Sequence, residues 1–300
     1  MNTQGFGRMV GVILALAVPA ASWAAAETVA TAVYARVGNG YRRAKAGDGS
    51  FKPEYYALSN GGRMAGTTTD ITVDRVAYPE VAEIAMRLLA QQNYRYAQRE
   101  DEADLLLVLQ WGNTIGFDRI NYAQSVNQAA SIHAEAMVNE AVPDPSRKER
   151  LESALIKLMM ENRARDRINA HNARVIGYFD DLNESNDIRR WAGGGDRYRE
   201  LIGDVEESRY YVVISAFDFG EIQKRGKKKL LWQARVSVRT SGNAFDDSVA
   251  AMLKSASKYF GQDSGRLVRS EETKGTVELG DLKFLGEAKN PEKSPTKEGK

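Results

Sequence analysis

Two histidines are the side chains in this sequence best suited to metal or acid–base chemistry. His133 is followed two positions later by Glu135, which matches the H-x-E half of a zinc-deaminase signature. The other half needs a C-x-x-C pair, and the chain contains no cysteine. His171 belongs to a separate helical segment, so both histidines are predicted to be solvated helix residues. We therefore predict neither a metal site nor a cofactor.

The usual catalytic and phosphate-binding motifs are also missing from the sequence. There is no G-x-S-x-G nucleophile turn. The glycines at 193–195 lack the Lys-Ser/Thr pair of a phosphate loop, and Gly38-Asn39-Gly40 lacks the third glycine of a dinucleotide fingerprint. Acidic clusters at 100–102 and 180–181 have the chemistry for acid–base work, but their spacing singles out no pair. The sequence therefore favours a protein that is not an enzyme.

The densest charged feature is a basic segment formed by five residues: Lys224, Arg225, Lys227, Lys228 and Lys229. One interpretation is a contact site for anionic headgroups, nucleic acid or an acidic partner. The other is a solvated hairpin tip whose charges oppose edge-to-edge strand pairing. The segment contains no aromatic residues, which favours the second interpretation. The formal net charge of only +2 gives no reason to expect nucleic acid as a partner.

Residues 1–26 have the pattern of a cleaved signal peptide. Arg8 precedes an apolar run over 9–21, and small residues at 22–26 make Ala26, or alternatively Ala24, a suitable cleavage position. A membrane span needs roughly 20 apolar residues, so the short run favours a cleaved signal peptide over the alternative of a retained anchor. We expect a bacterial protein that is periplasmic or secreted, with no transmembrane span and no lipid-bearing cysteine in the mature chain.

The elements that would position any site begin with a strand over 28–37. Residues 51–64 suggest short strands and turns, and 67–73 are β-prone. A helix over 78–92 has Pro79 in its first turn and an apolar stripe at helical spacing. The apolar run at 103–109 then predicts a central strand that is covered on both faces.

The middle of the chain changes character. An Ala-rich helix is predicted over 121–140, prolines at 143 and 145 end it, and Ser146 is placed to cap a second helix. That second helix carries one apolar stripe at helical spacing, made of Leu151, Ala154, Leu155, Leu158 and Met159. We interpret residues 118–209 as a helical hairpin inserted between core elements.

The chain then returns to core elements. Strands are predicted over 210–217 and 230–239 as an antiparallel hairpin, with Gln233, Arg235, Ser237 and Arg239 on a solvated face. A helix follows, with Asn243 as its N-cap and Phe260 at its end. A last strand is predicted over 277–285, and the polar tail over 287–300 should be disordered.

These elements predict an α+β fold: a small mixed or antiparallel sheet with helices packed on one face, plus the inserted hairpin. The core would comprise 27–117 and 210–286. The helix with the run at 103–109, together with 211–214, 231–236 and the helix ending at Phe260, resembles an uncharacterised family of bacterial envelope and lipoprotein-type domains. The resemblance implies an envelope location and a sheet with helices on one side, but no reaction. The chain departs from that family by lacking a lipid-bearing cysteine and by carrying the long insertion.

The sequence therefore predicts an exported, non-enzymatic domain that binds another cell-envelope component, with 118–209 as its contact element. Two alternatives stay open. One is a hydrolase that cleaves an envelope glycan or peptide through carboxylates. The other is a carrier that holds a small apolar ligand in a cleft between sheet and helices.

Overall fold

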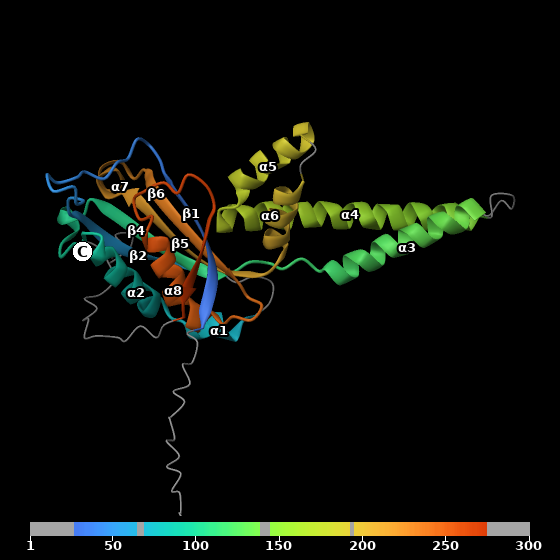
Figure 1. The fold of residues 1–300 in the computed structure, drawn as a ribbon, viewed down its shortest axis with the longest axis horizontal. Coiled ribbons are helices and arrows are strands. Elements are labelled where there is room, and N and C mark those ends of the chain that lie inside the picture. The colour runs from blue at the N-terminus through green and yellow to red at the C-terminus, as the bar shows by residue number, and fades with distance from the viewer. Residues whose placement is uncertain (1–26, 65–68, 139–144, 193–194, 275–300) are drawn as a thin grey trace, which may run out of the picture.

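The computed structural model describes residues 27–64, 69–138, 145–192 and 195–274, and its fold is α+β (Figure 1). A mixed seven-stranded sheet has the order β3-β2-β4-β5-β6-β1-β7. The strands are β1 (Thr28–Val37), β2 (Glu54–Met64), β3 (Tyr94–Tyr96), β4 (Leu105–Asn113), β5 (Arg209–Asp218), β6 (Leu230–Arg239) and β7 (Val268–Thr273). The helices are α1 (Ile71–Arg75), α2 (Tyr78–Gln91), α3 (Arg119–Val138), α4 (Pro145–Ile176), α5 (Phe179–Ala192), α6 (Asp196–Glu206), α7 (Phe219–Arg225) and α8 (Phe245–Ser257).

The centre of the sheet follows the prediction. β5 and β6 pair antiparallel, with Val212 opposite Val236, which confirms the predicted hairpin. β4 pairs antiparallel with β5 on the other side, and β2 runs parallel to both β3 and β4. β1 lies between β6 and β7 and is antiparallel to both. The sheet is therefore mixed, and its first strand in sequence is held by the last two.

One face of the sheet packs against α2 and α8 to form the larger core. Val81, Ala85 and Leu89 of α2 are fully buried in a cluster that also contains α8 and the inward residues of β4, β5 and β6. Trp232 and Phe260 stack with ring centroids 5.7 Å apart. The helical spacing of apolar residues thus predicted both helices, and their buried stripes hold them on the sheet.

The opposite face is covered in part by the inserted region. Tyr34, Tyr211 and Val213 pack with residues from the end of α4 and from α5 and α6. Ser237 was expected on a solvated face, but it is fully buried beneath this second layer. The predicted alternation is present, but the local pattern of β6 contains no sign that a distant segment covers this face. Leu106 and Val108 stay half-buried, so β4 is fully covered on one face only.

Three local predictions are wrong in their details. Within the stretch predicted as β-prone at 67–73, residues 71–73 belong instead to helix α1, because Asp70 caps it by accepting a hydrogen bond from the Thr72 amide at 2.9 Å. The N-cap of α8 is Ala244, not Asn243, and the Phe245 amide instead donates to Thr72 Oγ1 at 3.0 Å. A third difference is that α4 begins at Pro145, which places Ser146 inside the first turn.

Several predictions concern residues outside those the structure describes. They are the signal peptide over 1–26 with cleavage at Ala26, the strand over 277–285 and the tail over 287–300. β7 over 268–273 was not predicted, because its residues are mostly polar. Within the described ranges, no helix combines the length and apolar character that crossing a membrane requires.

Candidate functional site

The most distinctive surface of the molecule lies on the helical hairpin, which projects away from the sheet (Figure 1). We call residues 119–138 and 145–164 the arm. Ten large apolar side chains are exposed in the described part of the chain, and seven of them lie on the arm. These seven are Ile120, Val126, Met137, Leu155, Ile156, Met159 and Met160. Exposed apolar side chains gathered in one region mark an interaction surface more often than isolated ones do.

α4 presents two different apolar faces along the arm. Leu151, Ala154 and Leu158 are half-buried on the side that packs against α3. At about 100° per residue, Ile156 and Met160 point roughly opposite to that side. Ile156 is 50% exposed and Met160 61% exposed.

The predicted single stripe of α4 is therefore divided. Leu155 and Met159 belong to the exposed side, with exposed fractions of 50% and 45%. The physical reason is that, among the described residues, α3 is the one helix that packs along this part of α4, and one neighbour covers a narrow seam rather than a broad stripe. We call Leu155, Ile156, Met159 and Met160 the outward face.

Glu206, at the end of α6, ties down the root of the arm. Its carboxylate is only 6% exposed and accepts a hydrogen bond from Arg165 Nε of α4 at 2.5 Å. Asn169 Nδ2 donates to the same oxygen at 3.1 Å. Nη2 of Arg119, the first residue of α3, lies 3.6 Å from the other carboxylate oxygen of Glu206. One buried carboxylate therefore holds the starting end of α3 and the middle of α4 together.

A neighbouring asparagine strengthens this root. Asn172 is completely buried, and its Nδ2 donates to the Ile115 carbonyl at 2.7 Å and to the Val205 carbonyl at 3.0 Å. Ile115 belongs to the link that leaves β4, and Val205 belongs to α6. The segments that enter and leave the insertion are thus joined through α4.

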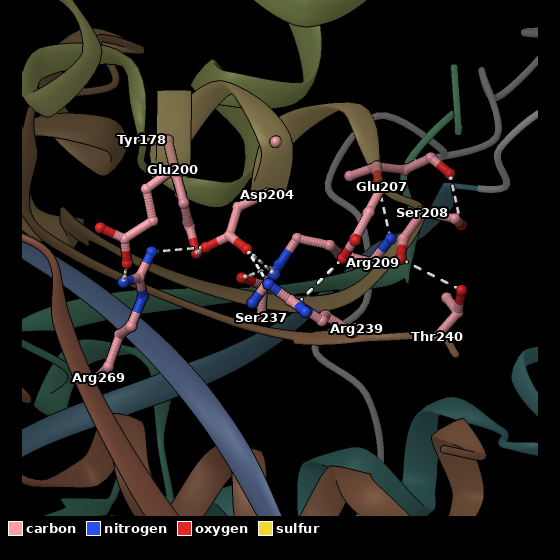
Figure 2. A network of polar contacts seen from close by, with 12 residues as sticks. Tyr178, Glu200, Asp204, Glu207, Ser208, Arg209, Ser237, Arg239, Thr240 and Arg269 are labelled. Atoms are coloured by element: carbon pink, nitrogen blue, oxygen red, sulfur yellow. Dashed lines mark hydrogen bonds and ion pairs between the residues drawn. The ribbon is translucent and has the colours of Figure 1, made fainter. Parts of the chain in front are cut away.

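A second buried carboxylate, Asp204, attaches α6 to the sheet (Figure 2). Asp204 is 3% exposed and faces guanidinium groups from three strands. Arg239 of β6 lies 2.7 Å and Arg269 of β7 2.6 Å from its oxygens. Arg209 of β5 lies 3.5 Å away, and its Nε donates to Ser237 Oγ at 3.1 Å.

The electrostatics of this cluster favour a charged Asp204. Burial alone would raise the pKa of Asp204, but the Arg209 charge and the Arg239 hydrogen bond together lower that pKa below its usual value. Glu200 pairs with Arg269, and Glu207 lies 3.0 Å from Arg239. Three arginines thus face three carboxylates, so the cluster is electrically balanced. It has the character of a structural clamp, not of a ligand site.

The basic segment is less concentrated than the sequence suggests. Lys224 and Arg225 form the last turn of α7, which Asp218 caps by accepting a hydrogen bond from the Glu221 amide. Arg225 lies 3.4 Å from Glu221, and Lys229 lies 3.7 Å from Asp218. Lys227 and Lys228 are exposed between α7 and β6. The segment therefore contains a helix end where a loop was expected, and two of its five cations have acidic neighbours.

The two histidines lie apart from this surface chemistry. His133 is exposed on α3 and His171 is exposed on α4, as expected for solvated helix residues. The described residues contain no group of three or more side chains placed to hold a metal ion.

Sequence reasoning predicted helices in this region but missed the residues that attach them to the sheet. Asp204 and Glu206 stand at the end of a short polar helix, where single acidic residues are common. Their partners come from separate elements, so no local spacing marks them. The available signal was indirect. Arg239 lies at the end of its strand, on a face where Gln233 and Ser237 are uncharged and Arg235 carries the other charge.

Compared with models of known protein families and with curated proteins, the chain matches none of them.

Proposed function

We propose that this protein is an exported, non-enzymatic domain of the bacterial cell envelope, and that its arm binds another envelope protein. The observation that carries the proposal is the outward face of α4. Leu155, Ile156, Met159 and Met160 form an apolar surface that no described residue covers. An amphipathic helix that lays such a face into an apolar groove is a common mode of protein recognition.

The charges around the outward face indicate the chemistry of the partner. Arg163 and Arg167 are exposed on the side of this face nearest the sheet. Glu152 lies toward the tip, within 3.8 Å of Lys148. A suitable partner therefore offers an apolar groove with acidic side chains at the end that receives the root of the arm.

The attachment of the arm supports the same function. The hydrogen bonds that Glu206 accepts and that Asn172 donates fix the arm's direction relative to the sheet. A projecting element that is held firmly at its root loses less conformational entropy on binding than a flexible loop does. Export is supported by residues 1–26, whose sequence is typical of a signal peptide.

Site-specific photo-crosslinking in the producing cell tests this proposal. A photoreactive residue would replace Ile156 on the outward face and, as a matched control, exposed Asp263 near the end of the core. We expect one envelope protein to be captured from position 156 and not from position 263. Equal capture at both positions, or no capture at 156, would contradict the proposal. Capture of only a second copy of the same chain would replace it with self-association.

A further inference from the structure

Two hollows meet at Arg235 of β6, on the sheet face that the insertion only partly covers. The smaller hollow, about 240 Å3, is lined by Arg235 with Tyr34, Arg174, Gly177, Phe179 and Asp180. The larger one, about 570 Å3, is lined by Arg235 with Arg36, Val37, Gly38, Asn39, Leu230 and Gln233. Together we call them the arginine hollow.

Strand register places its side chains next to one another. Tyr34 of β1 lies opposite Arg235 of β6, and Arg36 lies opposite Gln233. Since side chains two positions apart share a face of a strand, all four point to the same side of the sheet.

The turn between α4 and α5 forms the wall of the hollow. Gly177 in this turn has a φ of +84°, and a Cβ atom there would lie 2.6 Å from the Cβ of Tyr34. Glycine is therefore required both for the backbone conformation and for the close approach. This approach brings Arg174 and Asp180, which flank the turn, to the edge of the sheet.

The hollow has an excess of positive charge. Asp180 is its single carboxylate; it accepts a hydrogen bond from Tyr34 Oη at 2.5 Å and one from Arg36 Nη1 at 3.2 Å. Arg174 lies over the ring of Phe179, 4.6 Å from its centroid. Three guanidinium groups thus surround one acid.

Arg235 is the unusual member of this group. It is half-buried, yet its guanidinium forms no hydrogen bond or ion pair with the residues that the structure describes. Burial lowers the pKa of Arg235 by more than nearby Tyr34 and Asp180 raise it, which means that its charge is held at a cost to folding. The buried Arg209, by contrast, faces Asp204. A guanidinium group that makes no direct hydrogen bond or ion pair with the described residues, beside two open hollows, is typical of a binding group.

We propose that the arginine hollow binds the carboxylate or phosphate group of a small organic anion. Guanidinium groups match the geometry of these oxyanions and form charge-assisted hydrogen bonds with them. The ring of Phe179 offers an apolar wall for the rest of such a molecule. The site is separate from the outward face of the arm, so this inference does not depend on the proposed protein partner.

Binding of two simple probes to the purified protein tests the inference. The probes are phenyl phosphate and benzoate, with phenol as a neutral control, measured by calorimetry at constant ionic strength. We expect at least one anion to bind and phenol not to bind. Phosphate preference or carboxylate preference would identify the group recognised. Binding of neither anion would overturn the proposal.

Substitutions separate a binding role from a structural one. Arg235→Gln should weaken anion binding at least tenfold and, because an unpaired charge is removed, raise the melting temperature of the free protein. Arg266→Gln removes an exposed arginine that lines neither hollow and should change neither quantity. If Arg235→Gln lowers protein yield, Arg36→Gln serves as the second variant. Unchanged anion affinity in the tested hollow variant would overturn the assignment.

Discussion

The Glu206 carboxylate lies 2.5 Å from Arg165 Nε, and this contact joins the last turn of α6 to the middle of α4. It decides how the arm leaves the body of the molecule, because α3 starts from the same carboxylate through Arg119. A buried charge with several donors holds one orientation more strictly than apolar packing does.

Glu206→Gln should therefore loosen the root of the arm. We expect the free energy of unfolding to fall by about 1–3 kcal/mol, since hydrogen bonds to a charged group are weakened in a mostly buried site. Amide hydrogen exchange should accelerate in α3 and the first half of α4 more than in β5. Glu184→Gln, which changes an exposed residue of α5, is the matched control. Equal acceleration across the sheet would show that Glu206 stabilises the whole fold instead.

Asp204→Asn should be more damaging, because it leaves the buried Arg209 without a counter-charge. Breaking one side of a buried ion pair costs about 3–5 kcal/mol. Urea denaturation at neutral pH would measure the loss, with the exposed Asp187→Asn as control. A loss below about 1 kcal/mol would contradict the description of the cluster as a clamp.

Because of Asp204, the free energy of unfolding should also depend on pH. The pKa of Asp204 is lowered in the folded state, so its stabilising contribution is present above the unfolded value of about 3.9 and is lost as pH falls through the folded pKa. Stability of the wild-type protein should decrease with acid in that range. In Asp204→Asn the decrease should be smaller, which denaturation curves at a series of pH values would detect. Parallel curves for both proteins would refute this link.

The outward face should contribute to binding and little to stability. Ile156→Glu with Met160→Glu should change the free energy of unfolding by no more than about 0.5 kcal/mol, as for most exposed positions. Capture of the partner should be lost. Leu158→Glu, on the side facing α3, is the matched comparison and should destabilise the arm. If the outward pair destabilises the fold as much as Leu158→Glu, that face is not a free surface.

The basic segment should behave as a solvated helix end and loop. Lys227→Gln with Lys228→Gln should leave the melting temperature unchanged, and the wild-type protein should not sediment with vesicles that contain anionic lipid. Sedimentation that the double substitution abolishes would instead establish the alternative interpretation, a contact with anionic headgroups.

The proposed export can be tested directly by determining where the mature protein begins. The mature protein recovered from the producing bacterium should begin at Glu27, directly after Ala26. Intact-mass spectrometry would show this, and recovery of the full-length chain from the cytoplasm would contradict the proposed location.

The sequence predicted those elements whose residues carry a strong local pattern. α2 and β6 were found because period and burial agree within one segment. β7 was missed because an edge strand of mostly polar residues has no such pattern. The burial of Ser237 was missed for a different reason: the layer over this face of the sheet comes from α4, α5 and α6, more than 30 positions away.

The surface chemistry was less predictable than the fold. Arg235 and Tyr34 meet only because β1 pairs with β6. The sequence places Leu155 and Met159 of the outward face in the same apolar stripe as the residues that pack against α3. The position of α3 in the fold shows which of these residues stay exposed. Both surfaces depend on contacts between distant segments, which spacing in a single sequence does not encode.

The position of β1 between β6 and β7 has a consequence for how the chain folds. Its residues pair with partners such as Trp232 and Thr273, near the other end of the described chain. Because the protein is synthesised from its N-terminus, β1 stays unpaired until β6 and β7 have been synthesised. Contacts at such sequence separation slow folding and extend the time during which a strand edge is open. This side of the sheet is therefore completed late in folding. Removing β7 would expose the edge of β1, and removing β1 would expose the edge of β6.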